Sequence, residues 1–172
     1  MIITYLARTV FVALVATIGD YVWYEFDVRH TAVHGVLHGA ALLLAVGLVL
    51  GQQTGKWIKG VIGGVTAGVT GALAFYATYG AFSYLGALIA AWVFMWMVLA
   101  FVSAWVRGYP EDLPRWVPLG VIAAIGSGAT FYFVSGIWTG HPAARNYLWH
   151  LCAWTLAWAP GITALTWSRR DT

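Results

Sequence analysis

Charged side chains are scarce in this sequence of 172 residues. Asp, Glu, Lys and Arg together make up 9% of it, whereas 61% of the residues are hydrophobic. A soluble globular domain carries about 25% charged residues, so this shortage excludes a surface that faces water over most of its area. The nine Lys and Arg residues are spread along the chain and give a net charge of only +3. This pattern does not indicate a nucleic-acid partner.

Cysteine is almost absent, since Cys152 is the single one. An internal disulfide, a CxxC motif and a zinc-thiolate site are therefore excluded. The first apolar run also lacks the marks of a signal peptide. No basic segment precedes it, because Arg8 lies inside it, and no small-x-small cleavage site follows it. We expect it to be a retained transmembrane helix.

Long apolar runs are what the sequence does have. A helix needs about 20 apolar residues to cross a bilayer core. Six stretches meet this requirement, and the segments between them are short and polar or turn-forming. They cover residues 2–22, 33–50, 59–79, 83–106, 116–138 and 146–167. The sequence thus predicts an all-α fold, a polytopic membrane bundle of six transmembrane helices that forms one domain over residues 1–172.

The basic residues divide unevenly between the two sides of such a bundle. One side would hold both termini and the second and fourth connections. It carries seven of the nine basic residues, namely Arg8, Lys56, Lys59, Arg107, Arg115, Arg169 and Arg170. The other side carries Arg29 and Arg145. Because Lys and Arg accumulate on the cytoplasmic side, we predict that both termini are cytoplasmic.

Glycine recurs at four-residue spacing in the second and third runs. The positions are Gly35 and Gly39, Gly47 and Gly51, and the series Gly60, Gly64 and Gly68. Faces of small residues let helix backbones approach closely in lipid. The pattern has two interpretations: packing of helices within one subunit, or a homo-oligomer interface through these glycine faces.

Two further features concern the deeper parts of the runs. Pro160-Gly161 interrupts the sixth run, where a proline removes a helical hydrogen bond and favours a kink. Tryptophans also occur well inside the runs, at Trp92, Trp96, Trp154 and Trp158. These large side chains are expected either to fill the core or to line a cavity.

The histidines gather on the predicted outer side, together with three acidic residues. The set comprises His30, His34, His38, His141, His150, Asp20, Glu25 and Asp27. His30, His34 and His38 are spaced four residues apart, so each step rises about 6 Å and adjacent pairs are able to share a ligand. The same helical rise places His150 and Asp20 near the depth of His38. Ionisable groups in membrane spans usually face the bundle interior and are functional candidates.

Several interpretations of this cluster stay open. A transition-metal site would use His34, His38 and His150 with a carboxylate such as Asp20, although no HExxH motif is present. A b-type haem would need His38 and His150 to face one another. The cluster is equally explained as a hydrogen-bond network that ties the first, second and sixth helices together. It also fits the polar rim of a cavity that holds an amphiphile.

Nucleophilic catalysis has little support in the sequence. Ser127, Ser135 and Thr139 follow one another along the fifth run, but no orienting group completes a triad. We expect these hydroxyls to bond to backbone carbonyls within the helix. An ionisable path across the bilayer, which transport would need, is also missing from the inner half.

Four segments stand out towards the end of the chain: LGVIAA at 119–124, FYFVSGIW at 131–138, YLW at 147–149 and PGIT at 160–163, followed by the basic end at Arg169 and Arg170. In these segments and in its overall plan the chain resembles the Insig family of six-span membrane proteins and their prokaryotic homologues. The chain departs from the family at the start of the second helix, where histidines replace a Trp-Val-Pro-Pro segment, and after the fourth, where the family's aspartate is absent. The resemblance implies a non-enzymatic bundle in a bacterial or archaeal inner membrane, with an intramembrane pocket for a lipid-like or sterol-like molecule.

The leading hypothesis is therefore a non-enzymatic integral membrane protein with a lipid-like or sterol-like ligand. Its candidate ligand-binding residues are Asp20, His34, His38, His150, Trp154 and Trp158. The first rival is a metal- or haem-binding protein that uses His34, His38 and His150. The second is an accessory subunit of a larger membrane complex.

Overall fold

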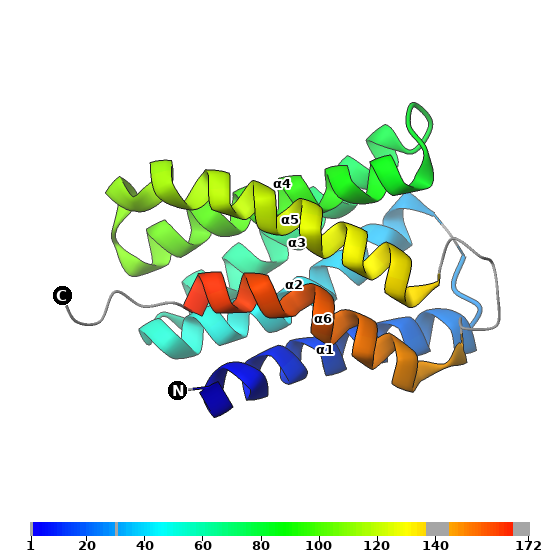
Figure 1. Cartoon of the computed structure of the whole chain (residues 1–172), viewed down its shortest axis with the longest axis horizontal. Helices are drawn as coiled ribbons and strands as arrows, with labels where there is room; N and C mark the ends of the chain where they lie inside the picture. The colour runs from blue at the N-terminus through cyan, green and yellow to red at the C-terminus, as the bar shows by residue number, and fades with distance from the viewer. Residues whose placement is uncertain (1, 30, 137–144, 167–172) are drawn as a thin grey trace.

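The structure is a computed structural model that describes residues 2–29, 31–136 and 145–166. These residues form an all-helical bundle without β-strands (Figure 1). The elements are α1 (Ile2–Glu25), α2 (Ala32–Thr54), α3 (Trp57–Thr78), α4 (Tyr84–Arg107), the short 3-10 helix η1 (Pro110–Asp112), α5 (Leu113–Ser135) and α6 (Tyr147–Thr166). The all-α prediction is confirmed. Of the predicted runs, the ends of the fifth and sixth, Trp138 and Trp167, lie outside the described residues.

Five of the helices, α1 to α5, are long and apolar enough to cross a membrane. Helix α6 has 20 residues but does not belong to this group within the described part of the chain. It contains His150, Pro160 and three tryptophans, and imidazole, indole and proline all lower its mean hydropathy. These side chains are polar or amphipathic, which suits a helix that faces other helices on much of its surface.

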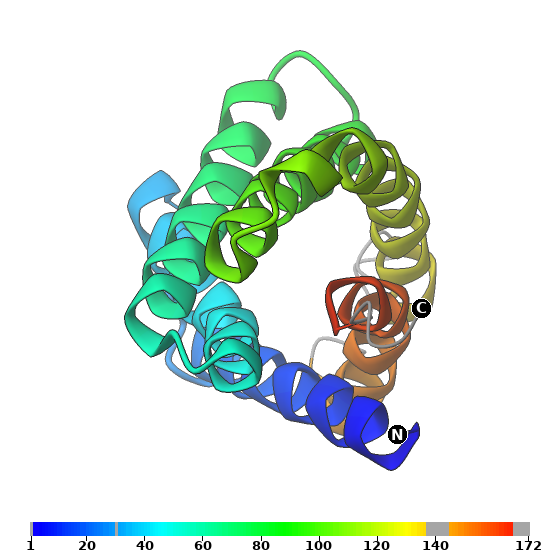
Figure 2. The ribbon, with the colours of Figure 1, turned by 90° about the vertical axis from the view of Figure 1, so that its left-hand side faces the viewer.

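The helices surround a common axis in chain order. Each helix packs against the next one, and α6 closes the ring by packing against α1 (Figure 2). Neighbouring helices run in opposite directions. The start of α1 and the end of α6 lie at the same end of the bundle as the connections α2–α3 and α4–α5 (Figure 1). The connections α1–α2 and α3–α4 lie at the opposite end, which we call the α1–α2 end.

The ends of the helices follow from local chemistry. Thr31 and Ser83 cap α2 and α4, because their side-chain oxygens accept from the backbone N–H of His34 and Gly86. Helix α5 stops at Ser135, before the end of the predicted run 116–138. Gly136 there adopts φ 71°, a left-handed conformation that ends a helix and favours glycine.

The glycine faces of α2 and α3 pack against each other within the chain. A Cβ added at Gly68 would overlap with the carbonyl oxygen of Gly39, and one at Gly60 would overlap with that of Gly47. The structure therefore shows the first of the two interpretations, close helix packing within one subunit. These faces are occupied and not free for a second subunit. Oligomerisation itself stays a prediction.

Large apolar side chains cover the outer surface of the ring. Ile3 is 81% exposed, Ile58 77% and Leu148 74%, and many other large hydrophobic residues are also exposed. A soluble monomer rarely exposes contiguous apolar patches of more than a few hundred Å². The surface is thus compatible with a protein whose solvent is the hydrocarbon of a membrane.

At the end of the bundle that holds the start of α1, basic side chains bond to helix termini. Lys56 donates from Nζ to the carbonyl oxygen of Val106 at 2.7 Å, in the last turn of α4. Arg107 donates from Nη2 to Oε1 of Gln53 at 3.3 Å, and Lys59 lies 4.9 Å from the ring centroid of Trp105. A cation at a helix C-terminus is favourable, because the unpaired carbonyls there carry partial negative charge.

We expect Lys56→Met to lower the free energy of unfolding by about 0.5–1 kcal/mol, because it removes this cation from the end of α4. Unfolding in detergent micelles, followed by circular dichroism, measures the change. Lys56→Arg keeps a cationic donor and serves as the control. An equal loss in both variants would contradict the interaction.

Candidate ligand cavity

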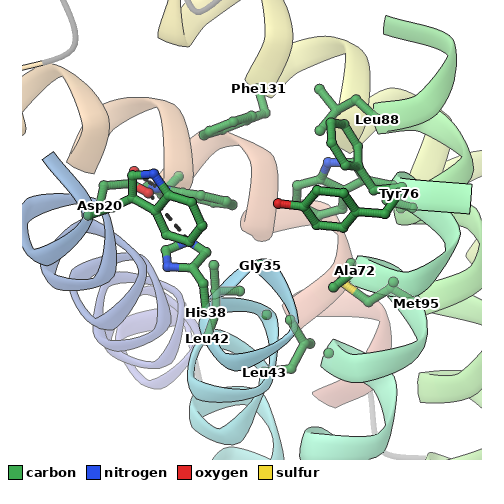
Figure 3. A pocket seen from close by; sticks show the side chains of 18 of the residues that line it. Asp20, Gly35, His38, Leu42, Leu43, Ala72, Tyr76, Leu88, Met95 and Phe131 are labelled. Carbon is green, nitrogen blue, oxygen red and sulfur yellow. Dashed lines mark hydrogen bonds and ion pairs between the residues drawn. The ribbon is translucent and has the colours of Figure 1, made fainter. Parts of the chain in front are cut away.

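A cavity of about 560 Å³ lies inside the ring, in the half towards the α1–α2 end (Figure 3). All six helices contribute to its wall. Asp20 comes from α1, His38 and Leu43 from α2, and Phe131 from α5. Further lining residues are Trp23, Tyr24, Gly35, Phe75, Tyr76, Tyr79, Tyr84, Leu88, Trp92, Met95, Trp154 and Trp158. The volume falls within the range of small-molecule sites, about 300–1,000 Å³.

Asp20 is the polar centre of this wall. It is buried in α1, and its Oδ2 atom accepts from Nδ1–H of His150 and from Nε1–H of Trp154, both at 2.7 Å. His38 approaches the other oxygen, with 3.5 Å between Nε2 and Oδ1. One carboxylate thus joins α1 to α2 and α6, which is the hydrogen-bond network expected from the sequence. Charged groups of this kind are buried only when they are paired and hydrogen-bonded.

Two glycines make room for the side chains at this polar end. A Cβ at Gly19 would lie 2.8 Å from Cε1 of His38, so the absent side chain lets the imidazole lie against α1 beside Asp20. A Cβ at Gly35 would collide with the ring of Tyr76. Tyr76 crosses over α2 at this point and points its hydroxyl across the cavity towards the side of Asp20 and His38 (Figure 3).

Aromatic rings form the deeper wall of the cavity. The ring centroids of Phe131 and Trp154 are 4.0 Å apart, those of Trp92 and Trp158 4.9 Å, and those of Trp154 and Trp158 6.1 Å. Trp158 is fully buried, and its indole N–H has no partner among the described residues. The four deep tryptophans divide accordingly: Trp92, Trp154 and Trp158 line the cavity, whereas Trp96 fills the core.

Trp96 explains the glycine that follows Pro160. A Cβ at Gly161 would overlap with the indole of Trp96, so only glycine admits this ring against α6. Helix α6 is continuous from Tyr147 to Thr166 and passes through Pro160. Gly161 therefore serves a core contact, a role that the sequence did not indicate.

The described histidines occupy two different places. His38 and His150 meet at Asp20, but His34 does not join them. Its Nδ1–H donates to the carbonyl oxygen of Arg29 at 3.0 Å, in the turn before α2. His34 is one helical turn nearer the start of α2 and contacts Thr31, the N-cap residue of this helix. His30 and His141 lie outside the described residues.

The metal and haem interpretations receive no geometric support. Among the residues that the structure describes, no group of three or more His, Cys, Asp or Glu side chains could hold a metal ion. His38 and His150 both turn towards the carboxylate of Asp20, which lies between them. A metal or haem iron would have to replace these contacts.

The remaining polar residues of the sequence prediction lie apart from the cavity. Glu25 accepts from the hydroxyl of Tyr147 and lies 3.6 Å from Nε of Arg145, at the α1–α2 end. Asp27 sits in the turn after α1 with φ 47°. Ser127 is buried, and its hydroxyl has no partner in the described part of the chain, so the expected bond to a helix carbonyl was wrong for this residue. Thr139 lies outside the described residues.

Apart from Trp92, the sequence did not indicate the lining residues of α3, α4 and α5. Tyr76, Tyr84 and Phe131 carry no pattern that separates them from the other aromatic residues. A weak signal was available in the glycines, since Gly35 faces Tyr76, and a Cβ at Gly128 would lie 2.9 Å from Cδ1 of Trp92. At these two positions, the missing side chain of the glycine lets an aromatic ring from another helix pack directly against the helix backbone.

Comparison with known proteins adds no relative, because no family model, curated protein or solved structure matches the chain.

Proposed function

We propose that this chain is a six-span integral membrane protein that binds a lipid-like or sterol-like amphiphile in the cavity and catalyses no reaction. The observation that carries the proposal is the cavity itself. It combines an apolar aromatic wall with one polar end inside a bundle whose outer surface is apolar. Concave, mainly apolar sites with a few convergent polar groups are typical of small-molecule binding.

Six spans and cytoplasmic termini are supported by the arrangement of the ring. Helix α6 packs between α1 and α5 and runs antiparallel to both, as a sixth span of the same bundle would. Lys56, Lys59 and Arg107 lie at the end that holds the start of α1, whereas Arg29 and Arg145 belong to the opposite end. Under the positive-inside rule the first of these ends is cytoplasmic. The cavity then occupies the outer half of the bilayer, in a bacterial or archaeal inner membrane.

A binding role fits the lining better than a catalytic one. Among the described lining residues there is no serine, threonine or cysteine to act as a nucleophile. The imidazoles of His38 and His150 are directed at Asp20 instead of at a reacting group. Acyl transfer needs a nucleophile within hydrogen-bond reach of its base.

The resemblance to the Insig family belongs to the same proposal. It rests on residues 119–124, 131–138, 147–149 and 160–163, and it implies the same kind of non-enzymatic bundle with a lipid pocket. Two positions of these segments now have a structural role, since Phe131 lines the cavity and Gly161 admits Trp96.

Native mass spectrometry of the gently purified protein tests the proposal. We expect about one small amphiphile per chain to be retained, because the volume of the cavity suits one drug-sized ligand. A helical membrane protein of similar size without a cavity, purified in the same detergent, is the control. Retention no greater than in this control would contradict the function.

A further inference from the structure

The cavity contains a buried carboxylate with no lysine or arginine beside it among the described residues. Asp20 lines the cavity, and none of the lining residues that the structure describes is a lysine or an arginine. Its partners are the neutral donor Trp154 and the two imidazoles of His38 and His150. A buried charge is costly unless an opposite charge compensates it.

Aromatic rings surround the space in front of this carboxylate. On the side of α1, Trp23 lies 5.3 Å from His38 and Tyr24 5.9 Å from His150 between ring centroids. On the opposite side, Tyr76 reaches across from α3 towards Asp20 and His38 (Figure 3). Phe75, Tyr79 and Tyr84 also line the cavity, and their ring centroids are 5.4–6.0 Å apart from one another. Rings of this kind attract a cation through the negative faces of their π systems, and aromatic cages recognise quaternary ammonium groups in this way.

Besides Asp20, the titratable groups that line the described part of the cavity or bond to Asp20 come from five helices. Tyr24 comes from α1, His38 from α2, Tyr76 and Tyr79 from α3, Tyr84 from α4 and His150 from α6. A tyrosine hydroxyl carries no positive charge in any protonation state. A negative charge on this carboxylate can therefore be compensated by a proton on His38 or His150, or by a cation that enters the cavity.

We infer that the ligand carries an ammonium head group, whose charge pairs with Asp20 inside the aromatic cage while its apolar tail extends along the deeper wall. This inference rests on the proposed function, since it names the chemical class of the amphiphile that the cavity takes. From the level of His150 the wall continues to Trp158, eight residues or about 12 Å further along α6. Leu43 of α2 and Met95 of α4 also line the cavity.

Three probes with one tail and different heads test the inference. Decyltrimethylammonium, decanol and decanoate are titrated into the protein in dodecyl maltoside micelles. Native mass spectrometry then gives an apparent Kd for each from the fraction of protein that carries one adduct. We expect the ammonium to bind roughly tenfold more tightly than the alcohol, and decanoate to bind most weakly, because a desolvated cation–π contact and a charge pair favour only the first.

Asp20→Asn is the matched variant, because it keeps an oxygen acceptor for His150 and Trp154 but removes the charge. We expect it to bind the ammonium and the alcohol about equally. If this variant fails to fold, the order of the three probes on the unaltered protein still decides. If the unaltered protein binds decanol or decanoate as tightly as the ammonium or more tightly, the inference of an ammonium head group is wrong. The proposed binding of an amphiphile in the cavity is not contradicted by that result. Binding of none of the three probes contradicts the cavity function itself, and the inference with it.

Discussion

Replacing Gly68 with alanine is expected to lower the free energy of unfolding by about 2–3 kcal/mol, the upper part of the usual range for overpacked cores. The added Cβ would overlap with the carbonyl oxygen of Gly39, and it would also crowd Cα of Ala40. Both obstacles lie on the backbone of α2, so no side chain is able to rotate away. The two helices must separate, and the dispersion contacts along the whole glycine face weaken together.

Gly126→Ala is the matched control for this variant. Gly126 also lies inside a helix, but nothing is within 4 Å of a Cβ added there. Alanine favours a helix over glycine by about 1 kcal/mol, so this control should leave the stability unchanged or raise it. Unfolding in micelles measures both variants. Similar stability in Gly68→Ala and Gly126→Ala would show that α2 and α3 are not packed through these glycines.

Replacing Asp20 with alanine should also cost several kcal/mol, for a different reason. His150 and Trp154 would lose the acceptor of their buried N–H groups, and His38 would lose its nearby charge. In soluble proteins the removal of one partner from a buried charged pair costs about 3–5 kcal/mol. Hydrogen bonds between membrane helices average less, about 0.6 kcal/mol each. Because the acceptor here is charged and serves two donors, we expect a loss of about 2–3 kcal/mol.

The control for Asp20→Ala is Glu111→Ala. Glu111 is an exposed acidic residue of η1, and substitution of such a surface residue changes stability by at most about 0.5 kcal/mol. Equilibrium unfolding of both variants, measured by tryptophan fluorescence, supplies the comparison. A change of less than 0.5 kcal/mol in Asp20→Ala too would mean that the carboxylate does not hold α1, α2 and α6 together.

The helices were predictable from the sequence because a helix that can cross a membrane consists largely of apolar residues. Runs of about 20 apolar residues need no knowledge of the partners they pack against. The exact ends were less predictable. Helix α1 continues to Glu25 instead of residue 22, and α5 begins at Leu113 instead of residue 116. The ends depend on caps and on polar residues beyond the apolar run, which hydropathy does not report.

The meeting of Asp20, His38 and His150 was partly predictable as well. Helical rise gives the depth of each residue, and residues of one depth are candidates for contact. Depth does not give the direction around the helix axis, however. His34 shows the difference, since it shares a helix with His38 but turns to the capping residues Thr31 and Arg29.

The rest of the cavity depends on which helices become neighbours. Tyr76 and Phe131 line it because the ring places α3 and α5 around the same space. The order in which the helices pack around the ring cannot be read from a single sequence. For the same reason, the sequence could not decide whether the glycine faces pack within one subunit or between subunits. Spacing shows that a close approach occurs, whereas only the fold shows which backbone approaches.

The central claim is that this cavity holds an amphiphile, and filling it tests the claim most directly. Leu88 on α4 lines the cavity, whereas Leu73 on α3 is 53% exposed on the outer surface. Native mass spectrometry of Leu88→Trp, Leu73→Trp and the unaltered protein, purified in parallel, compares the same substitution inside and outside. We predict that the unaltered protein and Leu73→Trp retain one small amphiphile per chain and that Leu88→Trp loses most of it. Equal retention by all three proteins would contradict the account.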